Sequence, residues 1–372
     1  MSHPFVETKE MTVGYRGVPL IRDIALRVHR GEILTLIGPN GSGKSTILKS
    51  LIRQLALIGG TVYLDGKLLQ TLPERDLART MSVLRTEHVR PELMTCWDVA
   101  AAGRYPYTGR LGLLSDEDRA KVDEALALVG ADELADRDFS CISDGQRQRV
   151  LLARAICQEP EVIVLDEPTS FLDIRYKLEL LTVLKQLVRE KQVAVILSLH
   201  EIDLAQKLSD RLICVHNGRI ERCGTPEQVF TGDYIRTLYD LERGTYNEQF
   251  GSLELERVTG EPRVFVIGGG GSGTALYRRL QRRGIPFAAG VLPENDVELP
   301  TARDRHRAGV SANRRGRLRA CAGACTAVRK CGLLSGFVRS SQRKKPRAAR
   351  LGTAGGAAAE QIGIGKNYMI IA

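Results

Sequence analysis

GPNGSGKST, at residues 38–46, is the most informative stretch of this sequence. It follows the apolar run Ile33–Ile37 and precedes a segment, from Thr46 to about Leu57, that has the apolar periodicity of a helix. A strand, a glycine-rich turn and a helix N-terminus in this order place consecutive backbone N–H groups around phosphate oxygens. We therefore predict a nucleotide-binding loop that comprises Gly38, Pro39, Asn40, Gly41, Ser42, Gly43, Lys44, Ser45 and Thr46.

Two side chains of this loop are candidates for chemistry, and a second segment supplies their counterparts. Lys44 carries a positive charge for the β- and γ-phosphates, and the Ser45 hydroxyl is a ligand that Mg²⁺ accepts. The segment VIVLDEPTS at residues 162–170 ends a buried strand in two carboxylates, which is unfavourable unless something positive meets them. We predict that Asp166 binds the metal and that Glu167 polarises a water molecule for attack on the γ-phosphate. A strand with a polar edge is the alternative for this run when it is taken alone.

The surrounding chain, up to about residue 255, alternates short apolar runs with amphipathic stretches. Ile33–Ile37, Val162–Leu165 and Val193–Leu199 are continuous apolar runs, as expected for strands buried on both faces. Ser115–Val129 is a predicted helix with a serine cap, three acidic residues in its first turn and Gly130 at its end. This rhythm is typical of an α/β protein with a largely parallel sheet.

Length and composition limit the classes of protein to which the chain can belong. With 372 residues, 43% of them hydrophobic and 26% charged, the chain is expected to form about two globular domains. It has no apolar run of about 18 residues and no signal-peptide pattern at its N-terminus, so we expect a cytoplasmic protein that does not itself cross a membrane. Five cysteines lie singly, many of them in apolar surroundings, and are expected to be reduced core residues: Cys96, Cys141, Cys157, Cys214 and Cys223.

The net charge of +10 is concentrated in the C-terminal tail. Residues 303–372 contain 16 Lys and Arg against 2 Asp and Glu, whereas residues 1–302 contain 38 against 42. The main body is therefore slightly acidic, and its charge does not support nucleic acid as a partner.

A third motif, ISDGQRQR at residues 142–149, resembles the signature of ABC-transporter ATPases, which is normally LSGGQ. The resemblance covers roughly residues 4–250 and implies a P-loop α/β fold with ATP and Mg²⁺ as cofactors. In that family the signature closes on the ATP held by a second copy, which assigns ATP binding to Ser143, Gly145 and Gln146. Asp144 replaces the first glycine of the pattern, and we expect its carboxylate to point away from the nucleotide.

Three further residues take roles from the same resemblance. Asp173, in SFLD at residues 170–173, matches the loop that passes between the two subunits. His200 ends an apolar strand and resembles the catalytic histidine that senses the γ-phosphate; a structural histidine is the alternative. Tyr15 resembles the aromatic residue that stacks on adenine; an edge-strand tyrosine is the alternative.

One element departs from the family pattern. Most members have a glutamine at the end of the strand before the helical subdomain, where it joins metal binding to contact with the permease. Thr86 occupies that position here, and Glu87 is next to it. Either residue could reach Mg²⁺, and Glu87 is the chemically better ligand. The alternative is that both are solvated loop residues.

The resemblance extends to a substrate class and to partners. MTCWDVAAAGRYPYTG at residues 94–109 resembles the helical-subdomain entry of ATPases that serve importers of ferric siderophores, haem and cobalamin. It implies an ABC ATPase domain at residues 1–255, with a helical subdomain at about 88–160. Such a domain pairs with a second copy and with permease subunits at the cytoplasmic face of the membrane, and indirectly with an extracytoplasmic substrate-binding protein.

Import of an iron–siderophore chelate is therefore the expected function. Import of haem or cobalamin is one alternative. A soluble ABC-type ATPase of translation or DNA repair is another, but the stretch from Thr86 to the signature shows no sustained heptads of an inserted coiled coil.

Residues 261–302 begin a second α/β unit. Gly268, Gly270 and Gly273 satisfy the spacing G-x-G-x-x-G after a predicted strand, and Glu294 or Asp296 lies where a ribose-binding acid would. Four consecutive glycines satisfy several patterns by chance, so we expect a partial Rossmann-like accessory domain. Dinucleotide binding, an interface role and no stable fold are the alternatives, and an oxidoreductase built on this unit lacks a recognisable catalytic partner.

The tail, residues 303–372, has a low-complexity basic composition. Cys321, Cys325 and Cys331 suggest zinc, but a fourth ligand at a usual spacing is missing, so incidental cysteines are favoured. The lack of periodicity and the excess of Arg, Ala and Gly lead us to predict a frameshift near codons 300–303, and a genuine disordered basic extension is the alternative. Reading the gene in its other two frames from that point distinguishes the two.

Overall fold

The structure is a computed structural model of the chain, and it describes residues 3–84, 91, 93–109, 111–170, 172–231, 233–247, 251–256, 258–261, 263–267, 271, 273–289, 292–293, 311–312, 318–319 and 369–371. The chain divides into two units. Unit 1 comprises Met1–Leu241 and Glu248–Ser252, and unit 2 comprises Glu242–Asn247 and Leu253–Ala372.

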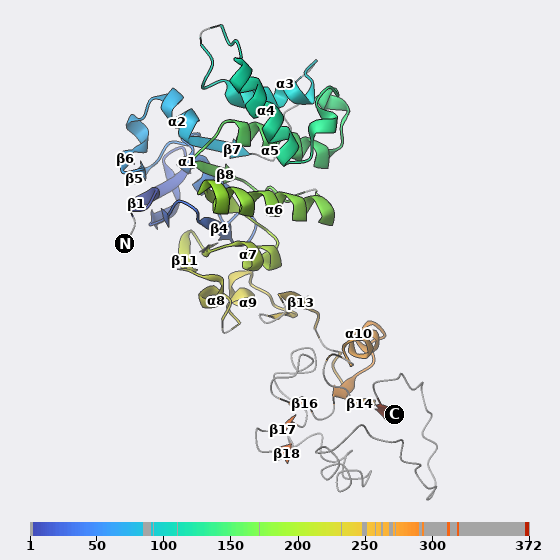
Figure 1. The fold of residues 1–372 in the computed structure, drawn as a ribbon. Coiled ribbons are helices and arrows are strands. Elements are labelled where there is room, and N and C mark those ends of the chain that lie inside the picture. The colour runs from blue at the N-terminus through green and yellow to red at the C-terminus, as the bar shows by residue number, and fades with distance from the viewer. Residues whose placement is uncertain are drawn as a thin grey trace, which may run out of the picture. The chain divides into compact units, whose positions relative to one another are not determined.

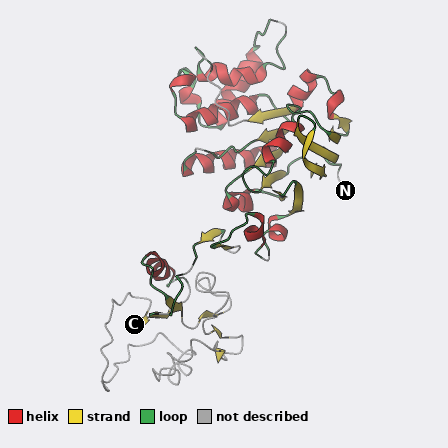
Figure 2. Ribbon diagram, turned by 180° about the vertical axis from the view of Figure 1, so that it is seen from behind, coloured by secondary structure: helices red, strands yellow, loops and turns green. Residues whose placement is uncertain are grey.

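The centre of unit 1 is a six-stranded sheet that is flanked by helices (Figures 1 and 2). Its strands are β4 (Ile33–Ile37), β7 (Met81–Leu84), β8 (Val162–Leu165), β9 (Ala194–Ser198), β10 (Arg211–His216) and β11 (Arg219–Gly224). The strand order is β11-β10-β4-β9-β8-β7; all neighbours are parallel except β11, which is antiparallel to β10. Every residue of β4, β8 and β9 is buried, which explains why these strands are almost entirely apolar, with Thr35 and Ser198 as their only polar residues.

A smaller antiparallel sheet shares its core with the central sheet. It consists, in order, of β2 (Val18–Ile24), β1 (Val6–Tyr15), β5 (Gly59–Leu64) and β6 (Lys67–Leu68), and β3 (Arg27–Val28) pairs with β1. One hydrophobic cluster contains Met11 from this sheet, Ile196 from the central sheet and Ile47 from α1 (Lys44–Leu51). Both sheets therefore hold α1, and the loop that precedes it, in place.

Helix α1 is shorter than the sequence predicted. It ends at Leu51, whereas the apolar periodicity predicted a helix to about Leu57. Arg53 adopts the left-handed conformation, with φ +60°, and the N–H groups of the next two residues both bond to the Lys49 carbonyl oxygen. These bonds close the helix. Leu57 still packs on the core from the loop beyond, so its apolar character extended the apparent period past the helix end.

The helical subdomain lies between β7 and β8 in the sequence and at the top of Figure 1. Its helix α4 (Asp116–Leu128) matches the prediction: Ser115 and Asp118 form a reciprocal capping box, and Gly130 beyond its end has φ +62°. The subdomain also contains α3 (Cys96–Ala101), α5 (Asp144–Cys157) and single turns at Ala102–Arg104, Asp132–Leu134 and Phe139–Cys141. Of the predicted core cysteines, Cys96, Cys157 and Cys214 are buried, but the prediction was wrong for Cys141 and Cys223, which are exposed. The other helices of unit 1 are α2 (Glu74–Thr80), α6 (Ile174–Lys191), α7 (Ile202–Leu208), α8 (Pro226–Val229) and α9 (Tyr234–Leu238), with a turn at Leu69–Thr71.

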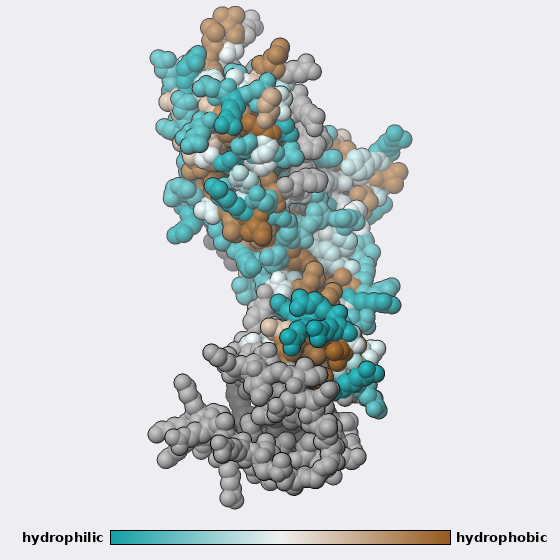
Figure 3. Space-filling view, turned by 90° about the vertical axis from the view of Figure 1, so that its right-hand side faces the viewer, coloured by the Kyte–Doolittle hydropathy of each residue, from teal (hydrophilic) through white to brown (hydrophobic). Residues whose placement is uncertain are grey.

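On the face shown in Figure 3, most of the coloured surface is polar, and exposed apolar side chains gather in a few places. One such place is the top of the molecule in Figure 3, where the helical subdomain lies. Within the helical subdomain, Leu93, Leu111 and Leu113 are each exposed by more than 70% of their surface. This subdomain therefore carries apolar surface that its own fold does not bury.

Unit 2 contains the predicted order of strand, helix and strand. β14 (Val264–Ile267) and β15 (Phe287–Ala289) are parallel, and α10 (Thr274–Arg282) connects them. The Tyr277 ring stacks on the Phe287 ring, with 5.1 Å between the centroids. A third strand, β19 (Met369–Ile371), runs antiparallel to β14. The remaining strands are β12 (Thr245–Asn247), β13 (Ser252–Glu254), β16 (Leu292–Pro293), β17 (Ser311–Ala312) and β18 (Leu318–Arg319).

Some residues with predicted roles lie outside the described residues. They are the two metal-ligand candidates, two glycines and two acidic residues of the second unit, and the tail cysteines: Thr86, Glu87, Gly268, Gly270, Glu294, Asp296, Cys321, Cys325 and Cys331. Their roles stay predictions.

Candidate nucleotide-binding site

A pocket in unit 1 gathers residues from distant parts of the chain. The loop between β4 and α1 forms one side, and the residues that follow β8 and β9 join it because parallel strands end at the same edge of a sheet. The described lining residues are Tyr15, Leu20, Asn40, Gly41, Gly43, Lys44, Ser45, Thr46, Glu167 and His200. All of these except Leu20 are among the predicted site residues.

Three glycines give the phosphate loop its shape. Gly38, Gly41 and Gly43 have φ angles of +147°, +77° and +103°. A Cβ atom at Gly38 would lie 2.1 Å from the Val215 carbonyl oxygen, and one at Gly43 would lie 2.5 Å from Cδ1 of Ile21. At Gly38 a side chain would meet backbone, and at Gly43 the left-handed φ would strain any residue with a side chain, so both positions favour glycine.

Lys44 points its ammonium group back into the phosphate loop. Its Nζ donates to the carbonyl oxygens of Gly38 and Pro39, at 2.8 and 2.9 Å, and the residue is only 4% exposed. Burial lowers the pKa of Lys44, because the charged form loses its hydration, although Glu167 and Asp166 act in the opposite direction. A phosphate group beside this ammonium would supply a charge partner in place of the lost water.

Asp166 lies between two hydroxyl groups at the end of β8. Ser45 Oγ donates to Asp166 Oδ1 at 3.0 Å, and Ser198 Oγ donates to the same oxygen at 2.7 Å. Hydroxyl and carboxylate oxygens are the ligands that Mg²⁺ prefers, so Ser45 and Asp166 fit a magnesium ion. Among the described residues, no cluster of three or more His, Cys, Asp or Glu forms a metal site of its own.

Glu167 and His200 meet directly. Glu167 Oε1 lies 2.5 Å from His200 Nε2, and the two side chains are about one-third exposed, at 31% and 34%. The backbone N–H of Glu167 donates to Ser198 Oγ at 2.9 Å, so one serine contacts both acids of the motif. A carboxylate and an imidazole in contact at an open pocket can orient water and contact a phosphate.

Glu201 ties the loop after β9 to the loop after β8. Its Oε2 accepts from Thr169 Oγ1 at 2.7 Å, and its Oε1 lies 2.6 Å from Lys177 Nζ. Burial raises the pKa of this carboxyl, but the contacts with Lys177 and Thr169 lower it by more, so the net shift is downward. Glu201 therefore connects the residue after His200 to the loop after β8 and to Lys177 in α6.

Tyr15 ends β1 beside the first turn of α1. Its ring is half exposed, and its hydroxyl lies 3.3 Å from Thr46 Oγ1. Leu20 lines the same pocket and is 40% exposed. An exposed ring and a leucine next to the phosphate loop suit contact with a nucleobase, which is the role predicted for Tyr15.

The signature residues lie at the N-terminus of α5 and are not among the described lining residues. Ser143 caps α5: its Oγ accepts from the Gln146 N–H at 3.3 Å, and its own N–H donates to Gln146 Oε1 at 2.9 Å. Asp144 forms an ion pair of 2.7 Å with Arg147 of the same helix. The carboxylate of Asp144, which stands where the family pattern has glycine, is therefore paired with a cation of its own helix.

Tyr176 joins the start of α5 to the start of α6. Asp173 caps α6, with its Oδ1 accepting from the Tyr176 N–H at 3.0 Å. The Tyr176 ring lies so close to Gly145 that a Cβ there would be 2.7 Å away. Gly145 and Asp173 therefore both lie against Tyr176, and neither is among the described residues that line the pocket of their own chain.

The prediction missed several residues around the site, and three of them contact the phosphate loop, the two acids or the pocket itself. Ser198 bonds to both acids after β8, Leu20 lines the pocket, and the Tyr239 hydroxyl accepts from the Gly38 N–H at 3.2 Å. Ser198 is the one polar residue in the apolar run before His200, and this could have marked it as a candidate site residue. No local pattern points from Tyr239 to a loop that lies 201 residues earlier.

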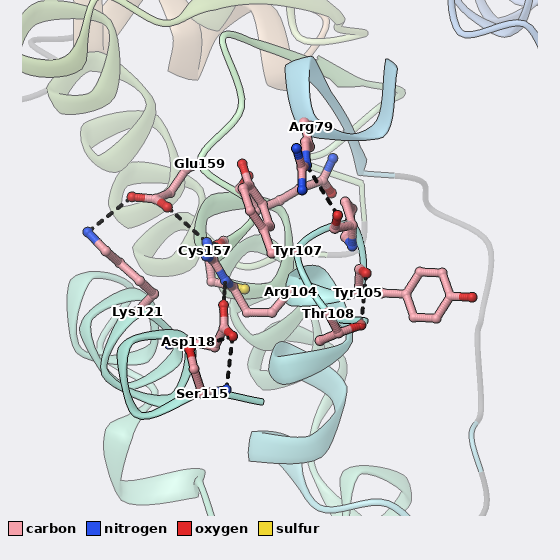
Figure 4. A network of polar contacts seen from close by, with 12 residues as sticks. Arg79, Arg104, Tyr105, Tyr107, Thr108, Ser115, Asp118, Lys121, Cys157 and Glu159 are labelled. Atoms are coloured by element: carbon pink, nitrogen blue, oxygen red, sulfur yellow. Dashed lines mark hydrogen bonds and ion pairs between the residues drawn. The ribbon is translucent and has the colours of Figure 1, made fainter. Parts of the chain in front are cut away.

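A buried ion network holds the segment GRYPYTG in the helical subdomain (Figure 4). Arg104 donates to Asp118 Oδ1 at 2.8 Å, to Glu159 Oε2 at 2.9 Å and to the Cys157 carbonyl oxygen at 2.7 Å. Its guanidinium also lies over the Tyr107 ring, 4.0 Å from the centroid. Because Asp118 belongs to α4 and Cys157 ends α5, Arg104 connects these two helices to the segment.

Several known proteins are similar to this chain. The profile of the family described as ABC transporter matches residues 21–170. An uncharacterised ABC transporter ATP-binding protein of Methanocaldococcus jannaschii is 41% identical over 288 residues, 77% of this chain and 99% of that protein. The iron(3+)-hydroxamate import ATP-binding protein of Bacillus subtilis is 35% identical over 237 residues, 64% of this chain and 88% of that protein. A cobalamin import ATP-binding protein of Halobacterium salinarum is 33% identical over 300 residues, 79% of this chain and 75% of that protein.

A solved structure supports the fold. A dimeric bacterial ABC transporter cassette matches with a TM-score of 0.53 at 26% identity, and the match covers 59% of this chain and 98% of that one. The predicted fold class, a P-loop α/β fold with a helical subdomain, is confirmed. No helix in the described part of the chain has both the length and the apolar character needed to span a bilayer.

Proposed function

Because this chain belongs to the ABC transporter family, whose ATP-binding proteins hydrolyse ATP, we propose that it is the ATPase subunit of an importer. The observation that carries the proposal is the meeting of Lys44, Glu167 and His200 in one pocket. A cationic group for phosphate, a carboxylate for water and an imidazole in contact with that carboxylate are the parts that phosphoryl transfer to water needs.

The described residues divide this chemistry among them. Lys44 and the N–H groups of the phosphate loop bind the β- and γ-phosphates. Mg²⁺, when held by Ser45 and Asp166, supplies positive charge against the phosphate oxygens. Glu167 orients a water molecule and accepts its proton, while His200 fixes the Glu167 carboxylate and contacts the γ-phosphate.

A second copy completes each site. ABC cassettes dimerise, as in the similar dimeric cassette. Ser143, Gly145, Gln146 and Asp173 lie apart from the pocket of their own chain, which supports a role opposite the ATP of a second copy. Hydrolysis in both sites would then reopen the dimer and reset the transporter.

The names of the relatives support a metal-chelate cargo. The iron(3+)-hydroxamate relative favours a ferric siderophore, and the cobalamin relative, similar over a longer stretch, makes cobalamin the second candidate. The chain would act at the cytoplasmic face of the membrane with permease subunits, which a substrate-binding protein on the other side supplies with cargo. Leu93, Leu111 and Leu113 offer the permease an apolar contact surface.

Co-expression with the nearest permease genes tests this proposal. The chain should co-purify with the permease, and in lipid vesicles a binding protein loaded with a ferric hydroxamate should raise its rate of ATP hydrolysis. Stimulation by cobalamin instead would identify the second candidate as the cargo. A chain that hydrolyses ATP but binds no permease would contradict the importer role.

A further inference from the structure

We propose that Tyr239 is a positioning residue for the phosphate loop and that it acts on Lys44 through Gly38. The Gly38 N–H donates to the Tyr239 hydroxyl oxygen at 3.2 Å. The carbonyl oxygen of the same glycine accepts from Lys44 Nζ at 2.8 Å. One residue of the loop therefore connects the tyrosine to the lysine that meets the phosphates.

Gly38 depends on such an external anchor. Its φ of +147° lies in a region that only glycine adopts readily, and a peptide unit there has many accessible orientations when nothing holds it. The Val215 carbonyl oxygen limits it on one side, because it lies 2.1 Å from the position of a Cβ. The Tyr239 hydroxyl provides the directional contact that selects one orientation of the Gly38 N–H.

Tyr239 is itself fixed by the fold. It follows α9, whose Ile235 and Leu238 are completely buried. The carboxylate of the next residue, Asp240, contacts His216 at the end of β10, with 3.1 Å between Asp240 Oδ2 and His216 Nε2. A tyrosine held from its own helix and from the central sheet can position a loop without moving with it.

The chemistry of the hydroxyl suits this place. Burial raises the pKa of Tyr239 to about 12, so the group stays neutral near pH 7. A neutral oxygen accepts the Gly38 N–H without bringing negative charge to a loop that receives phosphate. Tyr239 is not among the described lining residues of the pocket, so its influence passes through Gly38.

The inference rests on the proposed ATP binding and predicts where the effect of a substitution falls. The contacts described for Tyr239 involve the loop that binds phosphate, whereas Glu167 and His200 lie elsewhere in the pocket. Loss of the hydroxyl should therefore weaken ATP binding and leave the rate of the chemical step nearly unchanged.

Tyr239→Phe in the full chain is the test, because it keeps the ring and removes only the hydroxyl. We expect the Kd for ATP and the KM to rise about 3- to 10-fold, the range for one neutral hydrogen bond, with kcat within about two-fold of the parent. Tyr234→Phe is the matched control. It removes a hydroxyl from α9, the helix that Tyr239 follows; this hydroxyl contacts Glu221 Oε2 at 3.4 Å and the Cys214 side chain rather than the loop.

The outcomes separate the inference from the proposed function. A parental Kd in Tyr239→Phe, or an equal rise in both variants, would overturn the positioning role. Failure of the unaltered chain to bind ATP would overturn the proposed function instead. If Tyr239→Phe lowers the melting temperature too far for titration, Asp240→Asn should give a smaller rise in Kd by loosening the contact with His216, and an unchanged Kd there would count against the proposal.

Discussion

Glu167 adopts a backbone conformation that residues with a side chain rarely occupy. Its φ is +50°, in the left-handed region, which costs roughly 1–2 kcal/mol. Its N–H bond to Ser198 Oγ and its contact with His200 hold it there. Strain of this kind concentrates at functional sites, because it aims a side chain that a relaxed backbone would turn elsewhere.

Glu167→Gln should therefore lower the rate of ATP hydrolysis by about 10²- to 10⁴-fold, since the amide cannot take up the proton of water. The amide has the size of the carboxylate, so ATP binding should persist and the ATP-bound dimer should accumulate. Turnover assays and gel filtration with ATP measure both effects. Glu179→Gln, in an exposed ion pair with Arg175, is the control, and hydrolysis at the parental rate in Glu167→Gln would refute the assignment.

Prediction at the residue scale depends on how far apart the partners lie in the sequence. Lys44 and Glu167 could be identified because each belongs to a motif defined by its immediate neighbours. Ser198 and Tyr239 contact the same motifs but lie 31 and 201 residues away from their partners in the sequence. A local sequence pattern cannot indicate a contact between residues so far apart. Glu87 stays a predicted metal ligand, outside the described residues.

At the scale of elements, Arg104 connects two helices of the helical subdomain, α4 through Asp118 and α5 through the Cys157 carbonyl oxygen. Arg104→Met should lower the free energy of unfolding by about 3 kcal/mol, because it leaves Asp118 nearly buried without its cation. Denaturant titration measures the change. Arg175→Met is the matched control: its ion pair is also 2.8 Å long but exposed, so stability should change little. Equal effects in the two variants would show that burial of the Arg104 pair is unimportant.

The helices show which signals locate an element correctly. The start and end of α4 were predictable because Ser115, Asp118 and Gly130 each carry a terminus signal of their own. The end of α1 was not, because Arg53 gives no such signal and the apolar residues continue past it. The strands β4 and β8 matched their apolar runs, since burial on both faces makes them almost wholly apolar, with Thr35 the only polar residue in the two strands.

At the scale of the whole molecule, every described residue of the pocket belongs to unit 1. Deletion of residues 303–372 should therefore leave kcat and KM for ATP unchanged, although it removes β19, the strand that pairs with β14 in unit 2. The isoelectric point should fall, because the deleted segment carries 16 basic and 2 acidic residues. ATPase assays of the truncated and full chains measure the first effect. Loss of ATP binding would show that the tail contributes to the catalytic fold.

The order of strands lies beyond what the alternation of elements can predict. Runs of apolar residues indicated an α/β fold, but β4 lies between β9 and β10, which follow it in the chain by more than 150 residues. Long crossover connections of this kind leave the neighbours of a strand undetermined by local pattern. The second strand–helix–strand unit was predictable because β14, α10 and β15 are adjacent in sequence.

The separation of the signature residues from the pocket of their own chain has a consequence for how this protein can evolve. If the proposed homodimer forms, a single gene encodes both faces of each ATP site, so any mutation at Ser143 would enter the two sites at the same time. No unmutated partner remains to sustain activity while a compensating change arises. An exchange such as the one that placed Asp144 in the signature must therefore be tolerated at once, and the ion pair with Arg147 of the same helix is a local remedy that needs no change across the interface.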